Sequence, residues 1–213
     1  MKLKYFSLLI STTGICILYL ISKLSQPVLI EISDMRDYEG KEVIIKGLVK
    51  EHHLTKFGSQ IITIVDDNST TEIYLEGIKE IEYGDLLQVT GEVQNYQDKW
   101  EIMVNDNRQV KILEKWQNIT MPLWQLAENP TKYIDLNVNV TGYVEFVSND
   151  NFYLVDLDKK HSLLVLYSNP GNITIYPGQK IFIFGRFSFD KENFRYRIKV
   201  FEEHHKIEQA LEE

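Results

Sequence analysis

The stretch that decides the fold is GLVKEHHLTKFGSQIITIVDDNSTTEIYL, from Gly47 to Leu75, followed by IEYGDLLQVTGEV, from Ile81 to Val93. In both segments β-branched and aromatic residues alternate with polar ones, and clusters of Gly, Asp, Asn and Ser separate the runs. A period of two between turn clusters is typical of half-buried strands. The first half of the chain is therefore predicted to form five strands, at 42–50, 61–66, 72–75, 86–93 and 100–104.

The same pattern occurs again about 94 residues later. Five aligned pairs of positions carry the repeat: Gly47 with Gly142, Asp66 with Asp156, Gly84 with Gly178, Gly91 with Gly185, and Trp100 with Phe194. A small barrel bends its first and fourth strands sharply, and glycine permits such bends. The repeat predicts an all-β fold of two tandem five-stranded barrels. The domains are expected at 28–113 and 121–207, with a linker at 114–120 and a tail at 208–213.

The first unit resembles the OB-folds of anticodon-binding domains and of single-stranded nucleic-acid-binding proteins, especially archaeal ones. The resemblance covers Val28–Leu113 closely. It covers Leu123–Ile207 more loosely, because Ser168–Pro177 is a Pro/Gly/Asn loop where many OB-folds have a helix. This resemblance implies two OB-fold domains whose ligand is single-stranded nucleic acid.

The N-terminal segment, 1–26, differs in composition from the rest of the chain. Residues 5–21 are uncharged, and Lys2 and Lys4 precede them. This length is near the minimum for a transmembrane helix, and no small-residue cleavage site follows it. The expectation is a single-pass membrane protein with an uncleaved N-terminal anchor. Four Asn-x-Ser/Thr sites favour barrels on the extracytoplasmic side of the membrane, at Asn68, Asn118, Asn139 and Asn172.

The sequence contains none of the common catalytic motifs: no Gly-rich phosphate loop, HExxH, CxxC or GxSxG. The one cysteine, Cys16, lies in the N-terminal segment, which excludes disulfides within the barrels. Two histidine pairs, His52-His53 and His204-His205, are expected to be solvated. Neighbours on a strand point to opposite faces, so neither pair should chelate one ion. The chain is predicted to be a binding protein, not an enzyme, without a cofactor or metal.

A weaker resemblance is to the haem chaperone of cytochrome c maturation, which also joins an N-terminal anchor to an OB barrel. That family carries haem on a His after the last strand, closely followed by a Tyr. His204 and His205 lie in a similar place, but the segment HHKIEQALEE contains no Tyr. The chain also holds two barrels instead of one, so this is the least favoured interpretation.

Strand alternation gives two candidates for stacking on nucleic-acid bases. If Ile62 and Ile64 point inward, Thr63 points outward, and the repeat places Tyr153 at the same outward position. The same argument places Tyr74 outward on the third strand. Exposed aromatic side chains on these strands can stack on bases. The alternative is that both tyrosines cover a neighbouring strand at the surface.

Basic residues concentrate in the second unit. Arg195, Arg197 and Lys199 share one face of the last predicted strand, and with Arg186 they are candidate phosphate contacts. The alternating residues Phe194, Tyr196 and Ile198 are expected to fill the barrel.

Total charge opposes nucleic-acid binding, because the chain has a net charge of −8. Residues 28–113 contain nine Lys and Arg against seventeen Asp and Glu, and residues 120–213 contain ten against thirteen. An extracytoplasmic protein- or glycan-interaction module therefore remains the alternative function. The sequence leaves the oligomeric state undetermined.

Overall fold

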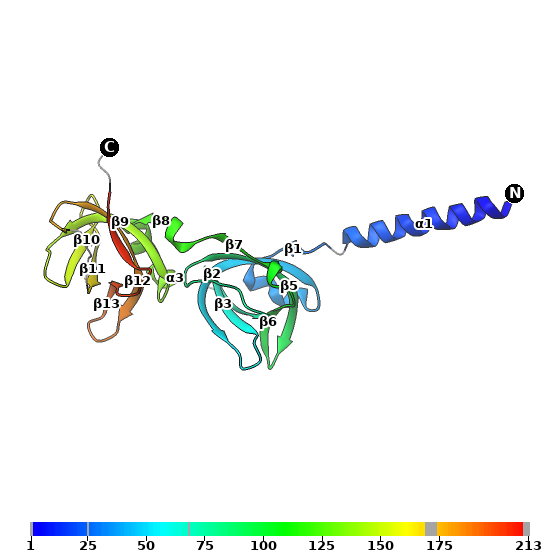
Figure 1. The fold of residues 1–213 in the computed structure, drawn as a ribbon, viewed down its shortest axis with the longest axis horizontal. Helices are drawn as coiled ribbons and strands as arrows, with labels where there is room; N and C mark the ends of the chain where they lie inside the picture. Colours follow the sequence, from blue (N-terminus) through cyan, green and yellow to red (C-terminus); the bar gives the residue numbers. More distant parts are fainter. Residues whose placement is uncertain (1, 25, 68, 169–173, 211–213) are drawn as a thin grey trace.

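The computed structural model describes residues 2–24, 26–67, 69–168 and 174–210. Helix α1 (Lys2–Leu24) projects away from two β-rich units that follow it (Figure 1). The first unit contains β1 (Val28–Leu29), β2 (Glu42–Leu54), β3 (Gln60–Asp66), β4 (Ser69–Leu75), β5 (Leu86–Tyr96), β6 (Lys99–Val104) and β7 (Val110–Glu114). The second contains β8 (Thr120–Pro122), β9 (Asn137–Glu145), β10 (Asn151–Val155), β11 (Ser162–Tyr167), β12 (Lys180–Asp190), β13 (Arg195–Val200) and β14 (Lys206–Gln209). Short helical segments are η1 (Ile32–Tyr38), η2 (Asn107–Gln109), η3 (Trp116–Asn118), α2 (Leu123–Glu128) and α3 (Pro130–Tyr133).

The first sheet closes into a five-stranded barrel, which we call barrel 1. Its strand order is β2-β3-β4-β6-β5, and β2 pairs with β5 to complete the ring. Neighbouring strands are antiparallel except β4 and β6, which run parallel. β1 adds to β2, and β7 adds to β5. A five-stranded Greek-key barrel of this kind is the OB-fold.

The second sheet repeats this topology as barrel 2. Its order is β9-β10-β11-β13-β12, β12 pairs with β9 to close the ring, and β11 runs parallel to β13. β8 and β14 add to β9 and β12. Within the described ranges, the two sheets share no strand. The predicted all-β fold of two tandem five-stranded barrels is therefore confirmed.

Each barrel has its own hydrophobic core, built by the predicted alternation. Val43 and Ile45 of β2 are fully buried in one cluster, as are Ile62 and Ile64 of β3. Phe152 of β10, with residues of β9, β11, β12 and β13, belongs to the other cluster. Two separate cores explain why the sequence can repeat a complete barrel pattern.

Two equivalent glycines show that the two barrels share the same local backbone geometry as well as a sequence pattern. A Cβ atom on Gly91 would lie 2.5 Å from Ile102 Cγ2, and one on Gly185 would lie 2.6 Å from Ile198 Cγ2. Real Cβ atoms essentially never approach so closely. Glycine is therefore required where β5 crosses β6 in barrel 1 and where β12 crosses β13 in barrel 2.

One predicted equivalence is wrong. Tyr96 pairs with Lys99 at the end of the β5–β6 hairpin, whereas Asp190 pairs with Arg195 in the β12–β13 hairpin. The second hairpin loop is therefore two residues longer, so Trp100 corresponds to Tyr196 and not to Phe194. Tyr196 packs against the core of barrel 2, while Phe194 is exposed.

The predicted single-pass membrane localisation is also corrected. The polar run Ser11-Thr12-Thr13-Gly14 interrupts the apolar sequence in the middle of α1. In the part of the chain that the structure describes, no helix is long and apolar enough to cross a membrane.

The sequons differ in accessibility. Asn118 is exposed, but Asn139 is 2% exposed, and its Nδ2 donates to the Gln117 carbonyl and to Thr120 Oγ1. Asn68 and Asn172 lie outside the described residues.

The two barrels contact each other around Trp116, which is buried between them. Its indole Nε1 donates to Glu82 Oε2 over 2.7 Å, and its ring packs edge-on against Phe184 of barrel 2. Gly84 of barrel 1 lies so close to barrel 2 that a Cβ atom would be 2.4 Å from the Asn137 carbonyl oxygen. The relative position of the barrels therefore depends on packing as well as on the linker.

Candidate nucleic-acid interface

The strand register brings the predicted basic residues of barrel 2 together with Tyr153. Tyr153 is opposite Leu164, Leu164 is opposite Arg197, and Arg197 is opposite Ser188. Because residues in register share a face of the sheet, these four side chains form one row on the outer surface. Period-two alternation places Arg195 on the same side of β13 as Arg197.

A second row lies one step along the same surface. Asn151 is opposite Leu166, Leu166 is opposite Lys199, and Lys199 is opposite Arg186. The outer surface formed by Tyr153, Arg186, Arg195, Arg197 and Lys199 is called the basic face below. It crosses β10, β11, β13 and β12, and two leucines lie at its centre.

The cations of the basic face differ in their interactions. Arg197 Nη1 is 2.9 Å from Asp190 Oδ2. Arg186 stacks its guanidinium over the ring of Tyr83 in barrel 1, 4.1 Å from the ring centroid. Within the described chain, Arg195 and Lys199 form no ion pair. The basic face therefore retains free positive charge.

The Asp190–Arg197 pair is part of a tightly bonded hairpin loop. Asn193 Nδ2 donates to Asp190 Oδ2 over 2.9 Å, and the backbone N–H groups of Glu192 and Asn193 donate to Oδ1. These hydrogen bonds and the charge of Arg197 hold the pKa of Asp190 below its usual value.

Two polar groups at the centre of the basic face lack partners among the described residues. Arg197 Nε and Ser188 Oγ, from facing positions of β13 and β12, are enclosed and form no hydrogen bond. Buried polar groups in proteins are nearly always paired. Arg197 therefore keeps donor capacity that its pairing with Asp190 does not use.

Two exposed phenylalanines border the basic face at opposite ends. Phe194 directly precedes β13 and is 82% exposed, and Phe146 directly follows β9 and is 72% exposed. Both have positive φ angles, 50° and 48°, which are uncommon for bulky residues and cluster at functional positions. Sequence reasoning overlooked Phe146 and assigned Phe194 to the core.

Tyr74 is not part of the basic face, because it lies in barrel 1. Its hydroxyl donates to Ser59 Oγ over 2.8 Å, and Met103 is opposite it on β6. Glu92 and Glu101 of barrel 1 occupy the positions that Arg186 and Arg197 occupy in barrel 2. The equivalent face of barrel 1 is therefore acidic at two of the positions where that of barrel 2 is basic.

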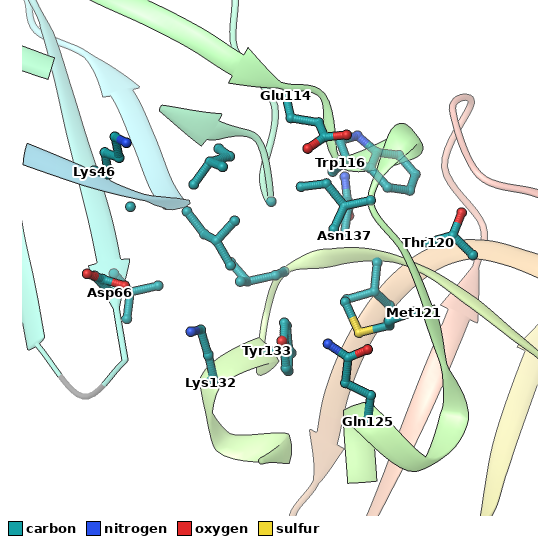
Figure 2. Close-up of a pocket in the computed structure, with 18 residues that line it drawn as sticks. Lys46, Asp66, Glu114, Trp116, Thr120, Met121, Gln125, Lys132, Tyr133 and Asn137 are labelled. Carbon is teal, nitrogen blue, oxygen red and sulfur yellow. The ribbon is translucent and has the colours of Figure 1, made fainter. Parts of the chain in front are cut away.

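A cleft of about 270 Å³ separates the barrels beside their contact (Figure 2). Lys46 and Asp66 line it from barrel 1, and Lys132 and Tyr133 line it from α3. Lys132 Nζ is 2.7 Å from Asp67 Oδ1. Burial opposes the charge on Lys132, but the hydrogen bond and the charge of Asp67 raise its pKa. This ion pair links the two barrels across the cleft.

The two histidines of the pair His204-His205 have different surroundings, contrary to the expectation that both are solvated. The His205 side chain is 1% exposed and packs edge-on against Trp116 at the barrel contact. Its Nδ1 accepts from the backbone N–H of Glu202, and its Nε2 lies 3.2 Å from Asn137 Oδ1. This pattern fits a neutral ring, and burial lowers the pKa of His205.

Within the described ranges, no three His, Cys, Asp or Glu side chains gather into a group that could hold a metal ion.

No family model matches the chain, and no curated protein matches its sequence. Among solved structures, asparaginyl-tRNA synthetase from Pyrococcus horikoshii is 14% identical, with a TM-score of 0.36 over 40% of this chain and 23% of the synthetase. Ten1 from Saccharomyces pombe is 16% identical, with a TM-score of 0.31 over 44% of this chain and 85% of Ten1. The p204 HINb domain is 12% identical, with a TM-score of 0.34 over 81% and 97% of the two chains.

The matched region spans 23% of the Pyrococcus horikoshii synthetase and 21% of a putative aspartyl-tRNA synthetase from Leishmania major. The OB-fold assignment rests on the strand order and closure of the two sheets.

Proposed function

We propose that the chain is a non-enzymatic OB-fold binding protein whose second barrel binds single-stranded nucleic acid along the basic face. The observation that carries the proposal is the register that aligns Tyr153 with Arg197, and Lys199 with Arg186, on one surface. OB-folds bind oligonucleotides on the face of their second and third strands and with the loops at its edges.

The chemistry of the basic face supports this ligand class. Single strands bind in positively charged grooves that follow the phosphates, with aromatic side chains on which bases stack. Lys199 and Arg195 supply cations that form no ion pair with any residue the structure describes, and Tyr153 supplies a half-buried ring between them and β9. Phe146 and Phe194 supply exposed rings at the two ends.

The net charge of −8 does not exclude this function, because the excess acid lies mainly in barrel 1. Affinity depends on the local field at the site, while the acidic barrel weakens long-range attraction. We therefore expect modest affinity that rises steeply as salt is lowered.

The direct test is a titration of the full chain into a fluorescein-labelled oligothymidylate of about 16 nucleotides, the upper site size of one OB-fold. Saturable binding in about 50 mM salt, where phosphate contacts are strongest, is expected. Replacing both Phe146 and Phe194 with Ala should weaken it without changing its salt dependence. An absence of binding under these conditions would rule out the proposed function.

Protein binding is a second candidate, favoured by the equivalent face of barrel 1. There Ile61, Tyr74 and Met103 are in register, and Glu92 and Glu101 lie at neighbouring positions. A half-buried apolar strip with an acidic border suits a basic protein surface. A chain that fails to bind the oligonucleotide would leave this as the better-supported function.

A further inference from the structure

Barrel 2 has a cavity where two of its strands separate. The parallel pairing of β11 with β13 begins only at Leu164 and Arg197, although β11 starts at Ser162 and β13 at Arg195. Helix α2 lies beneath this gap, and a cavity of about 460 Å³ remains between them. We call it the α2 pocket.

The α2 pocket has an apolar floor and a cationic opening. Leu126 and Phe187 form part of the floor and are both 1% exposed, while Lys160 and Arg195 lie at the surface end. Pockets of this size, with apolar walls and a few polar groups, are typical of small-molecule sites. The combination fits a ligand with a flat apolar part and an anionic group.

The loop that carries the cationic opening is held in place. Asp156 Oδ1 accepts from the backbone N–H groups of Lys160 and His161, and Asp156 Oδ2 is 2.7 Å from His161 Nδ1. This pairing fixes the imidazole of His161 and leaves its Nε2 for a ligand. The opening is thus a preorganised site and not only a gap between strands.

The corresponding cavity of barrel 1 has a more polar wall. It measures about 520 Å³, and its lining includes apolar Ile32 and Met35 and cationic Arg36 and Lys99. The hydroxyl groups of Ser69, Thr70 and Thr71 also line it. Thr63 stands where barrel 2 has Tyr153, and the acidic Glu72 stands where it has Leu164. Barrel 2 therefore differs from barrel 1 in having the ring of Tyr153 and the apolar Leu164 in this wall, where barrel 1 has a hydroxyl group and a carboxylate.

We infer that the α2 pocket receives one base of a bound strand, with a phosphate of that nucleotide at Lys160 and Arg195. This inference rests on the proposed function and deepens it. Tyr153 and Arg195 belong to both the pocket and the basic face, so a strand on that face passes the opening. Insertion of the base stacks it against apolar and aromatic walls, and the phosphate stays at the surface.

The experiment fills the α2 pocket. Ala127 of α2 lines it, so Ala127→Phe should occupy the space meant for the base. Thr70→Phe in the corresponding cavity of barrel 1 is the matched control. Lys160→Gln is a second variant at an exposed position, which removes a phosphate contact without touching the core.

Two probes are titrated into the full chain and all variants: the labelled oligothymidylate and the four nucleoside monophosphates. The chain is expected to bind at least one monophosphate, and Ala127→Phe and Lys160→Gln should each weaken that binding. Ala127→Phe should also weaken oligonucleotide binding about 5- to 150-fold, the effect of losing one stacked base. Its salt dependence should stay unchanged, and Thr70→Phe should have no effect.

The outcomes separate this inference from the proposed function. If the chain binds the oligonucleotide, Ala127→Phe leaves this binding intact and no monophosphate binds, the inference about the α2 pocket is overturned and the proposed function stands. Monophosphate binding that is lost in Ala127→Phe and Lys160→Gln, without oligonucleotide binding, supports the pocket as a nucleotide site and overturns the function. Binding of neither probe overturns both. If Ala127→Phe fails to fold, monophosphate binding unchanged in Lys160→Gln overturns the pocket.

Discussion

Gly84 and Gly178 occupy equivalent turns of the two barrels, and the pair offers a controlled test of the barrel contact. Both have positive φ angles, 92° and 86°. An alanine at either position is therefore strained, at a cost of about 1–3 kcal/mol. Among the described residues, the Cβ atom added at Gly178 meets nothing within 4 Å, so Gly178→Ala should show this strain alone.

Gly84→Ala should cost more, because its Cβ atom would lie 2.4 Å from the Asn137 carbonyl oxygen of barrel 2. Contacts of a Cβ atom shorter than 3.0 Å essentially never occur, so the two barrels must separate by at least about 0.6 Å. Overpacking of this kind costs roughly 1–3 kcal/mol beyond the strain. For a urea m-value of about 2 kcal/mol/M, the midpoint should fall by a further 0.5–1.5 M or so.

Urea unfolding of the wild-type chain and both variants, followed by far-UV circular dichroism, measures these differences. Amide chemical shifts supply the location: Gly84→Ala should shift resonances in both barrels, and Gly178→Ala only those of barrel 2. Equal midpoints for the two variants, or shifts confined to barrel 1 in Gly84→Ala, would refute the packed barrel contact.

Further predictions concern the same contact. His205 has a pKa below the unfolded value of 6.5 because it is buried, although Glu202 and Glu82 raise the pKa and Arg186 and His204 lower it further. The unfolded chain therefore binds the extra proton first, so the free energy of unfolding should decline as the pH falls below 6.5. His205→Gln should flatten this decline in urea titrations, whereas His204→Gln should not; equal slopes would contradict the assignment. Asp85→Ala should destabilise the chain by about 1–3 kcal/mol because it leaves the backbone N–H of the buried Trp116 without its acceptor, Asp85 Oδ1. Gln179→Ala, at the equivalent position of barrel 2, should cost less in the same assay, since among the described residues the Gln179 side chain accepts only from the Tyr176 backbone N–H.

Much of the fold could be predicted because local patterns determine it. Alternation identified the strands, and Gly91 and Gly185 marked a strand crossing that excludes any side chain in both barrels. The error at Phe194 arose because hairpin length is set by the loop: Asp190 holds a four-residue loop where barrel 1 has two residues. The constant offset of 94 residues that relates Gly91 to Gly185 cannot detect such an insertion.

The candidate site was predictable only in part. Alternation placed Arg195, Arg197 and Lys199 on one face, but it could not show that Arg197 is paired with Asp190 or that Arg186 stacks on Tyr83. Those contacts depend on strand register and on the barrel contact, which no local pattern encodes. For the same reason His205 was expected to be solvated.

The most direct test of the central claim is the salt dependence of oligonucleotide binding. Replacing Arg195, Arg197 and Lys199 with Gln should reduce the slope of log K against log salt by about 2, since each phosphate contact to a single strand contributes about 0.7. Replacing Lys41, Lys50 and Lys56, three exposed lysines of barrel 1, with Gln removes the same charge elsewhere and should leave the slope nearly unchanged. A slope that falls equally in both triple variants, or in neither, would contradict binding at the basic face.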